Sequence, residues 1–142
     1  MSKLILRDHI FISYATEDWV LADWLVLKLV SEGYHVWYDR LKMLGGESYP
    51  IDISDAIQKR SHRVVALLSK DSISKANPVK ERTLALNVAK ELNINDFLIP
   101  INVDGLKASD FDFLMADLVY ISFYKSWYNG LERLIEKLDQ VQ

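Results

Sequence analysis

Short apolar segments alternate with amphipathic ones along the chain. The apolar segments are compact, rich in β-branched and aromatic residues, and mostly apolar on both faces; they span 9–14, 34–38, 63–68, 97–103 and 118–123. Strands of this kind belong in a sheet that is covered on both sides. The pattern therefore predicts five buried β-strands.

Helical spacing marks the segments between these strands. The first predicted helix begins at Thr16, a plausible N-cap, and ends at Gly33, where a C′ glycine is expected. Its predicted apolar face consists of Leu21, Leu25 and Leu29. A shorter helix is expected to begin near Pro50, with the apolar stripe Ile53, Ala56 and Ile57.

Two further helices have clear start signals. Asn77 and Pro78 form a predicted cap followed by proline at the first helical position, which puts Glu81 in the first turn. The last helix carries Trp127 at its head and an apolar stripe of Leu131, Leu134, Ile135 and Leu138. The segment 106–114 is predicted to hold a short helix. Trp19, Trp24 and Trp127 lie at helical apolar spacing and are expected to pack in the core.

Strands that alternate with helices predict an α/β fold. Right-handed crossovers then favour a flavodoxin-like, doubly wound sheet of five mostly parallel strands, order 2-1-3-4-5, with helices on both faces. In such sheets ligands bind beyond the carboxyl ends of the strands, at the switch point between strands 1 and 3. Those ends are residues 13–15 and 68–70, and the helix with Glu81 should open onto the same crevice.

Composition narrows the class of protein. The 142 residues fit one domain over 1–142, and the formal charge of −3 with no basic run favours neither nucleic acid nor an anionic membrane as a partner. No cysteine is present, so disulfides and thiolate metal sites are excluded. No apolar run is long enough for a membrane span or a signal peptide. A cytoplasmic location is expected, for either a complete small protein or a domain cut from a longer one.

Several familiar sites are missing from the predicted crevice. Strand ends reading FISYA and ALLSK lack the acidic cluster and the aspartate of a response-regulator receiver domain, and no G-x-G-x-x-G or Walker A motif occurs. His9, His35 and His62 have no second ligand at helical spacing, so a structural role is favoured and no metal site is expected. Nothing supports a serine-hydrolase triad.

The connection 38–50, YDRLKMLGGESYP, is longer than most strand-to-helix loops. Gly45 and Gly46 permit backbone angles that other residues resist. Leu41, Met43 and Leu44 place apolar side chains where water is expected. Two interpretations remain open: the loop contacts a partner or ligand, or it is a turn whose leucines fold back onto the domain.

These segments together resemble a known family. HIFISYATED before an amphipathic helix, then GYHVWYDRLKMLGGE, then RVVALLS before a helix with a glutamate, are similar to the boxes of the Toll/interleukin-receptor (TIR) domain. The resemblance covers 9–142, and in this family 38–50 is the "BB" loop. The segments FLIPINVDGL and FYKSWYNGLERL look most like bacterial TIR domains of antiphage defence.

The resemblance implies two classes of function. Some TIR domains are scaffolds that assemble through the BB loop, whereas others are enzymes that cleave NAD⁺ at the nicotinamide–ribose bond. In the enzymes a glutamate near the start of the third helix is required, and Glu81 occupies that place. The axonal enzyme has tryptophan four positions earlier, where this chain has Asn77. An aromatic wall for nicotinamide must then come from elsewhere, with Tyr14 and Trp37 as candidates, or be absent.

The implied chemistry suits one carboxylate. Nicotinamide leaves as a neutral molecule, so Glu81 would stabilise the ribosyl oxocarbenium ion and no general acid is needed. The alternative is a surface glutamate that complements its own helix dipole, worth up to about 1 kcal/mol. NAD⁺ is the implied substrate and no cofactor is expected. The residues implied to bind it are Tyr14, Ala15, Arg40, Leu44, Gly45, Ser69 and Asn77.

Within that set Ser69 is expected on the floor of the crevice. Arg40, Leu44 and Gly45 are expected to close it, with Arg40 either at the pyrophosphate or in a surface ion pair. The resemblance also implies self-association, in which the BB loop of one subunit completes the pocket of the next, and a sensor domain or subunit upstream. Hydrolysis and cyclisation are not separated by the sequence, and a non-enzymatic TIR scaffold is the alternative.

Overall fold

The apolar segments form one parallel sheet in the computed structural model, which describes residues 7–38, 53–111 and 118–141. The sheet order is β2-β1-β3-β4-β5, and every neighbouring pair is parallel. The predicted α/β class and strand order are confirmed. The strands are β1 (His9–Ser13), β2 (His35–Trp37), β3 (Ser61–Leu68), β4 (Leu98–Asn102) and β5 (Ile121–Ser122).

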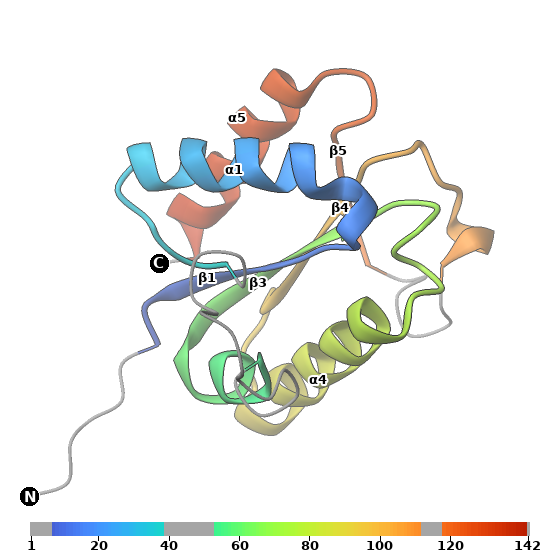
Figure 1. Cartoon of the computed structure of the whole chain (residues 1–142). Coiled ribbons are helices and arrows are strands. Elements are labelled where there is room, and N and C mark those ends of the chain that lie inside the picture. Colours follow the sequence, from blue (N-terminus) through green and yellow to red (C-terminus); the bar gives the residue numbers. More distant parts are fainter. Residues whose placement is uncertain (1–6, 39–52, 112–117, 142) are drawn as a thin grey trace, which may run out of the picture.

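Helices cover both faces of this sheet, as Figure 1 shows. One face carries α1 (Trp19–Ser31) and α5 (Trp127–Gln140), and the other carries the π-helix η2 (Ala56–Arg60) and α4 (Ala76–Leu92). Two short 3₁₀ turns, η1 (Thr16–Asp18) and η3 (Ala108–Asp110), lie in the connections. Among the described residues, no helix combines the length and the apolar character needed to cross a membrane.

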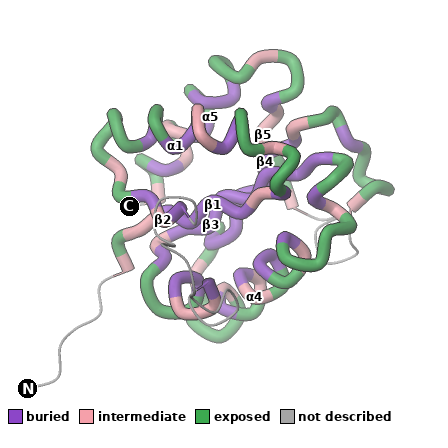
Figure 2. The backbone as a smooth tube through the Cα atoms, in the orientation of Figure 1, coloured by how far each residue is buried: buried purple, intermediate pink, exposed green. Residues whose placement is uncertain are grey.

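Side-chain alternation in the strands divides the core into two clusters. In β1, Ile10 and Ile12 pack with the buried leucines of α1 and α5, whereas Phe11 packs with η2 and α4 on the opposite face. The central strands β1, β3 and β4 are buried along most of their length, whereas the short edge strands β2 and β5 are partly exposed, as are the outer sides of the helices and the loops (Figure 2). Because successive side chains alternate, Ser13 must point to the same face as Phe11.

The register brings the ends of the central strands together. Ser13 at the end of β1 is the partner of Ala66 in β3, and Leu68 of β3 is the partner of Asn102 in β4. The carboxyl ends of β1, β3 and β4 therefore meet at one edge, where α4 begins. This edge includes the switch point between β1 and β3, where the crevice was predicted.

Two predicted helix starts are wrong. Thr16 begins the 3₁₀ turn η1 and does not cap α1, which starts at Trp19. Asn77 does not cap α4: the N-cap is Lys75, without a side-chain hydrogen bond, and Asn77 is already the second helical residue. Pro78 fits there because the first turn of a helix leaves its N–H groups without helical partners.

The other boundaries follow the sequence more closely. Gly33 follows the C-cap of α1 with a φ of +92°, as predicted. The described part of the short helix predicted in 106–114 holds the turn η3, and residues 112–114 lie outside the described residues. The fifth strand has only two residues. Trp24 packs against the core, with its ring 5.4 Å from that of Trp127. Trp19 is 47% exposed, so its predicted core position is wrong, and Trp127 is 38% exposed.

Helix α5 depends on a close approach to the sheet. Ser126 caps it by accepting a hydrogen bond from the backbone N–H of Asn129. Gly130, in its first turn, lies directly on the ring of Phe123, so a Cβ at this position would be 2.7 Å from ring carbons. Phe123 is fully buried and its ring has no space to move away.

Gly130→Ala is therefore expected to destabilise the fold by about 1–3 kcal/mol through overpacking. A glycine-to-alanine change in an unobstructed helix would instead stabilise it by up to about 1 kcal/mol. Thermal unfolding of Gly130→Ala and of the exposed neighbour variant Asn129→Ala checks this. An equal or higher Tm for Gly130→Ala would show that α5 does not need the close contact.

Candidate functional site

A buried serine and a buried glutamate meet at the carboxyl end of β1. The Ser13 hydroxyl donates a hydrogen bond of 2.7 Å to Oε1 of Glu81. Ser13 is 1% exposed and Glu81 is 6% exposed. A carboxylate is costly to bury and depends on such hydrogen bonds, so this pair fixes the acid against the sheet. Ser13 is a site residue that strand alternation could have identified.

Glu81 is not in the first turn of its helix, contrary to prediction. It is the sixth residue of α4 and lies in the second turn, on the side that faces β1. The dipole effect is confined to the first turn, so it does not account for the position of Glu81. The packing of α4 on the sheet explains the position of Glu81, since Ala85 and Val88 on the same side of the helix are core residues.

Arg82, beside Glu81, holds the connection that leads into α4. Its guanidinium is buried and donates to the backbone carbonyls of Ser72, at 3.0 Å, and Ile73, at 3.4 Å. Ser72 in turn donates to the carbonyl of Leu67 in β3, at 2.7 Å. This connection is therefore tied both to the sheet and to the helix, which keeps the start of α4 in place.

Two cavities flank the start of α4. One, of about 200 Å³, is lined by Glu81 with Ile53, Ser54, Ile57, Asn77, Lys80 and Leu84. The other, of about 300 Å³, is lined by Tyr14, Ala15, Thr16, Lys75, Ala76, Asn77 and Pro78. Asn77 borders both. Ligand pockets usually measure about 300–1,000 Å³, so the larger of the two is at the lower end of that range and the one beside Glu81 is below it.

Four of the predicted site residues thus gather here. Tyr14, Ala15 and Asn77 line the cavities beside Glu81. The ring of Tyr14 packs against that of Tyr38, with centroids 5.3 Å apart. Trp37, the other proposed nicotinamide wall, stacks on Phe11 at 5.2 Å and belongs to the core on the α4 face. Arg40, Leu44 and Gly45 lie outside the described residues.

Ser69 is fully buried and lines neither cavity. Its hydroxyl donates to the carboxylate of Asp18 and accepts from the backbone N–H of Ser72, at 3.0 Å. Its own N–H donates to the Ser72 hydroxyl, at 2.8 Å. In this arrangement Ser69 organises the turn after β3 and connects it to the start of α1.

Acidic groups surround Asp18 at this edge of the sheet. Burial raises the pKa of Asp18, and the charges of Asp104, Asp71 and Glu17 act in the same direction, while the hydrogen bond from Ser69 opposes them. Lys75 lies 2.9 Å from Glu17, and this contact lowers the pKa of Glu17 and raises that of Lys75. An anionic ligand group is therefore disfavoured beside Asp18 and favoured near Lys75 or Lys80.

A larger cavity, of about 560 Å³, lies at the other edge of the sheet between β4, β5 and α5. Its floor consists of strand residues such as Leu98 and Pro100, and its charged groups, Arg133, Glu136 and Lys137, lie along α5. Lys137 is paired with Asp96 at 2.7 Å. Among the described residues that line this cavity none is a buried carboxylate, so the edge with Glu81 is the better candidate for chemistry.

The fold and this site define a flavodoxin-like α/β domain with a carboxylate at the switch point of its sheet. The sequence profile of the TIR domain family matches residues 10–135. The chain belongs to the TIR domain family.

Its relatives are diverse. It is 31% identical over 137 residues to the uncharacterized protein y4cD of Sinorhizobium fredii; the match covers 96% of the chain but only 21% of that protein, about a fifth of its length. The TIR domain of the Toll-related receptor TRR-2 from Hydra magnipapillata superposes with a TM-score of 0.72 at 21% identity, over 90% of this chain and 94% of that one.

Two solved structures place the same fold in larger receptors. The TIR domains of the activated Roq1 resistosome match with a TM-score of 0.75 at 14% identity, over 92% of this chain and 98% of theirs. A TIR-STING receptor from C. gigas, in complex with 2′,3′-cGAMP, matches with a TM-score of 0.72 at 19% identity, over 93% of this chain and 40% of the receptor. At these identities the likeness concerns the fold.

The environment of Asp18 predicts a pH-dependent effect on stability. Because the folded-state pKa of Asp18 is raised, the native state binds this proton more tightly than the unfolded chain does. The contribution of Asp18 to stability therefore falls as pH rises through the range between the two pKa values, and the penalty persists at neutral pH. Asp18→Asn, which keeps an acceptor for Ser69, should raise Tm at pH 7 by a few degrees.

The difference from the wild type should shrink below about pH 4, where the unfolded-state carboxyl is also protonated. Thermal melts at both pH values check this, with the exposed Glu91→Gln as a control of equal charge change. A lower Tm for Asp18→Asn at neutral pH would instead indicate that the ionised carboxylate stabilises the fold.

Proposed function

We propose that this TIR domain cleaves NAD⁺ at the nicotinamide–ribose bond, with Glu81 as the catalytic residue. The observation that carries the proposal is the buried Glu81 carboxylate, which Ser13 at the carboxyl end of β1 holds at the edge of a cavity between residues 53–57 and α4. A glutamate at this place in the third helix is the feature that the NAD⁺-cleaving members of the family share.

The chemistry needs one fixed anion beside the ribose. As the glycosidic C1′–N bond breaks, its electron pair goes to the pyridinium ring and nicotinamide leaves uncharged. Positive charge then develops on the ribose, where the Glu81 carboxylate stabilises it. Water attacks C1′ and releases a proton, so that NAD⁺ and water give nicotinamide, ADP-ribose and H⁺. Attack by a group of the nucleotide itself would give a cyclic product from the same site.

The surrounding residues suit the remaining parts of the substrate. Among the described residues, Lys80 beside Glu81 and Lys75 in the other cavity are the cations that line the two cavities, and they suit a pyrophosphate. Asn77 lies between the two cavities and offers an amide for hydrogen bonds to ribose. Tyr14 supplies an aromatic ring at the border. Arg40 from the BB loop is proposed as a further contact to the pyrophosphate.

Self-assembly is proposed as the switch, and bacterial antiphage defence as the setting. The structural match to TIR domains within an activated resistosome supports assembly as a mode of action for this fold. A BB loop that completes the pocket of a neighbouring subunit would explain apolar residues in 38–50, most of which lie outside the described residues. A sensor domain or partner subunit would then control assembly.

The deciding assay follows nicotinamide release from NAD⁺ by concentrated protein, with and without a crowding agent. Glu81→Gln should lower the rate at least about a hundredfold, since it removes the charge that stabilises the transition state. Ser13→Ala should give a smaller loss, of about tenfold or more, because the carboxylate loses its anchor. Activity per molecule should rise with protein concentration if assembly completes the site.

Glu91→Gln is the matched control, because it removes an exposed carboxylate from the same helix. Its rate should equal that of the wild type. Unchanged release in folded Glu81→Gln would assign the chemistry to another group. No release from any variant, in protein shown to be assembled, would favour the second candidate function.

That second candidate is a non-enzymatic scaffold, and an exposed apolar face on α1 favours it. Helical spacing places Trp19, Val20, Leu27 and Val30 on one side of the helix, and they are 47%, 53%, 70% and 53% exposed. Exposed apolar side chains gathered on one side of a helix are typical of protein–protein contacts, and here Asp23 lies among them. The same face of α1 would also serve the assembly of an enzyme. The two candidate functions therefore share this face and differ in whether Glu81 is catalytic.

Leu27→Gln is expected to weaken self-association of the chain by about tenfold, because it places a polar group in the centre of the apolar face. Lys28→Gln, at the adjacent exposed position, should leave association unchanged. Sedimentation velocity over a concentration series measures both. Identical association of the two variants would exclude this side of α1 from the contact.

A further inference from the structure

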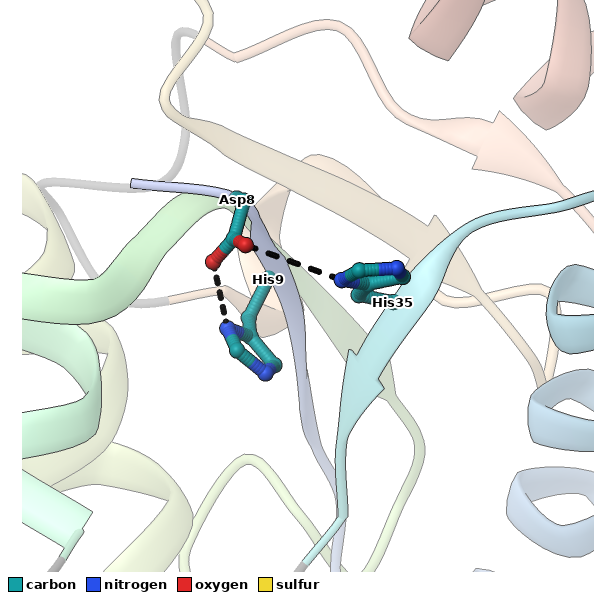
Figure 3. Close-up of side chains that lie close together, drawn as sticks. All are labelled: Asp8, His9 and His35. Carbon is teal, nitrogen blue, oxygen red and sulfur yellow. Dashed lines mark ion pairs between the residues drawn. The ribbon is translucent and has the colours of Figure 1, made fainter. Parts of the chain in front are cut away.

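Two histidines and an aspartate gather at the amino end of the sheet, at the edge away from Glu81. Asp8 precedes β1, and His9 and His35 are the first residues of β1 and β2. The parallel register makes His9 and His35 direct partners. Figure 3 shows the Asp8 carboxylate lying between the two imidazole rings. The histidines are isolated in the sequence, and it is the pairing of β1 with β2 that brings His9 and His35 together.

The distances suit donor atoms that share one ion. Nδ1 of His9 lies 2.8 Å from Oδ1 of Asp8, and Nδ1 of His35 lies 3.6 Å from Oδ2. One ligand atom from each residue falls within 4.8 Å of the others. Around an ion with bonds of about 2.1 Å, neighbouring ligand atoms are about 3 to 3.6 Å apart. The 3.6 Å contact of His35 lies at the upper end of this range, and the 2.8 Å contact of His9 lies slightly below it.

The nitrogen of His9 supplies a second observation. In the described part of the chain, Nδ1 of His9 is buried and makes no hydrogen bond, although the Asp8 carboxylate is 2.8 Å away. Buried polar atoms without a hydrogen bond are uncommon and call for an explanation. An ion held jointly by the ring and the carboxylate provides one.

We propose that Asp8, His9 and His35 bind a divalent transition-metal ion, with zinc as the best match. Two imidazoles and one carboxylate are ligands that zinc prefers, and three protein ligands leave a position for water. Magnesium and calcium prefer sites made of oxygen alone. Asp8 and His35 also border a cavity of about 350 Å³, which gives the ion access from solvent.

The nearby cation does not block the site. Arg7 borders the same cavity, but its guanidinium donates to the backbone carbonyls of Ile57 in η2, at 3.5 Å, and of Ser61 at the start of β3, at 3.1 Å. His62 also borders the cavity without belonging to the ligand set, since its nearest ring atoms fall outside the group. It therefore serves as an internal control.

Such an ion would join the central strand β1 to the edge strand β2. Only three residue pairs connect these strands, so a metal link at the first pair would add to a short contact. The ligands lie about 13 Å from Ser13, the length of β1. The proposal is thus independent of NAD⁺ cleavage, and its experiment does not use activity.

The test uses the full chain, purified with a tag that contains no histidine. Addition of zinc chloride should raise Tm by a few degrees, and isothermal titration calorimetry should show one zinc per chain. Magnesium chloride should have no effect. His35→Asn and Asp8→Asn should each weaken zinc binding at least about tenfold, the least that even an outer-sphere partner costs at such sites.

His62→Gln, the remaining histidine of the chain, should bind zinc like the wild type. Both His35 and Asp8 are largely exposed, with side chains 68% and 47% accessible, so their variants are expected to fold, which circular dichroism confirms. Absence of a zinc-dependent Tm shift in the wild type would overturn the proposal. Equal zinc binding by wild type and His35→Asn would do the same.

Discussion

Burial of both faces of the parallel sheet is the constraint on which the site depends. In β1 it sends Ile10 and Ile12 into one apolar layer and Phe11 into the other. Ser13, the last residue of the strand, is polar and points to the side of Phe11. It therefore meets the helix that covers that face, and Glu81 is the acid that α4 presents there. The same alternation builds the core and positions the carboxylate.

The fold could be predicted from sequence because its determinants are periodic. Buried strand runs and helical stripes specify the α/β class, the strand order and the leucines that α1 buries. Glu81, Tyr14, Ala15 and Asn77 could be assigned to one edge because parallel strands end together. These predictions needed only the local pattern of apolar residues and the rule that ligands bind at the carboxyl ends of parallel strands.

Other features depend on contacts between distant residues and left no local signal. Asn77 was predicted to be the N-cap, but the helix begins earlier and its N-cap is Lys75. Pro78 does not fix the exact start of the helix, because proline is tolerated in the first turn. Ser69 follows the strand as expected, yet its hydroxyl is used by Asp18 and Ser72. His9 and His35 lie on different strands, so their proximity follows from the register between β1 and β2. Residue spacing along the sequence does not reveal that register.

The contact between Ser13 and Glu81 also has a consequence for the order of folding. The two residues are 68 positions apart, and they meet only after β1 and β3 have paired and α4 has docked. Parallel pairing closes long loops, so it is slow compared with the formation of a local helix. A nascent or partly folded chain can hold helix α4 without holding Glu81 against the strand. The carboxylate is thus placed only in the completed domain, and a newly made chain lacks the candidate site until its folding has finished.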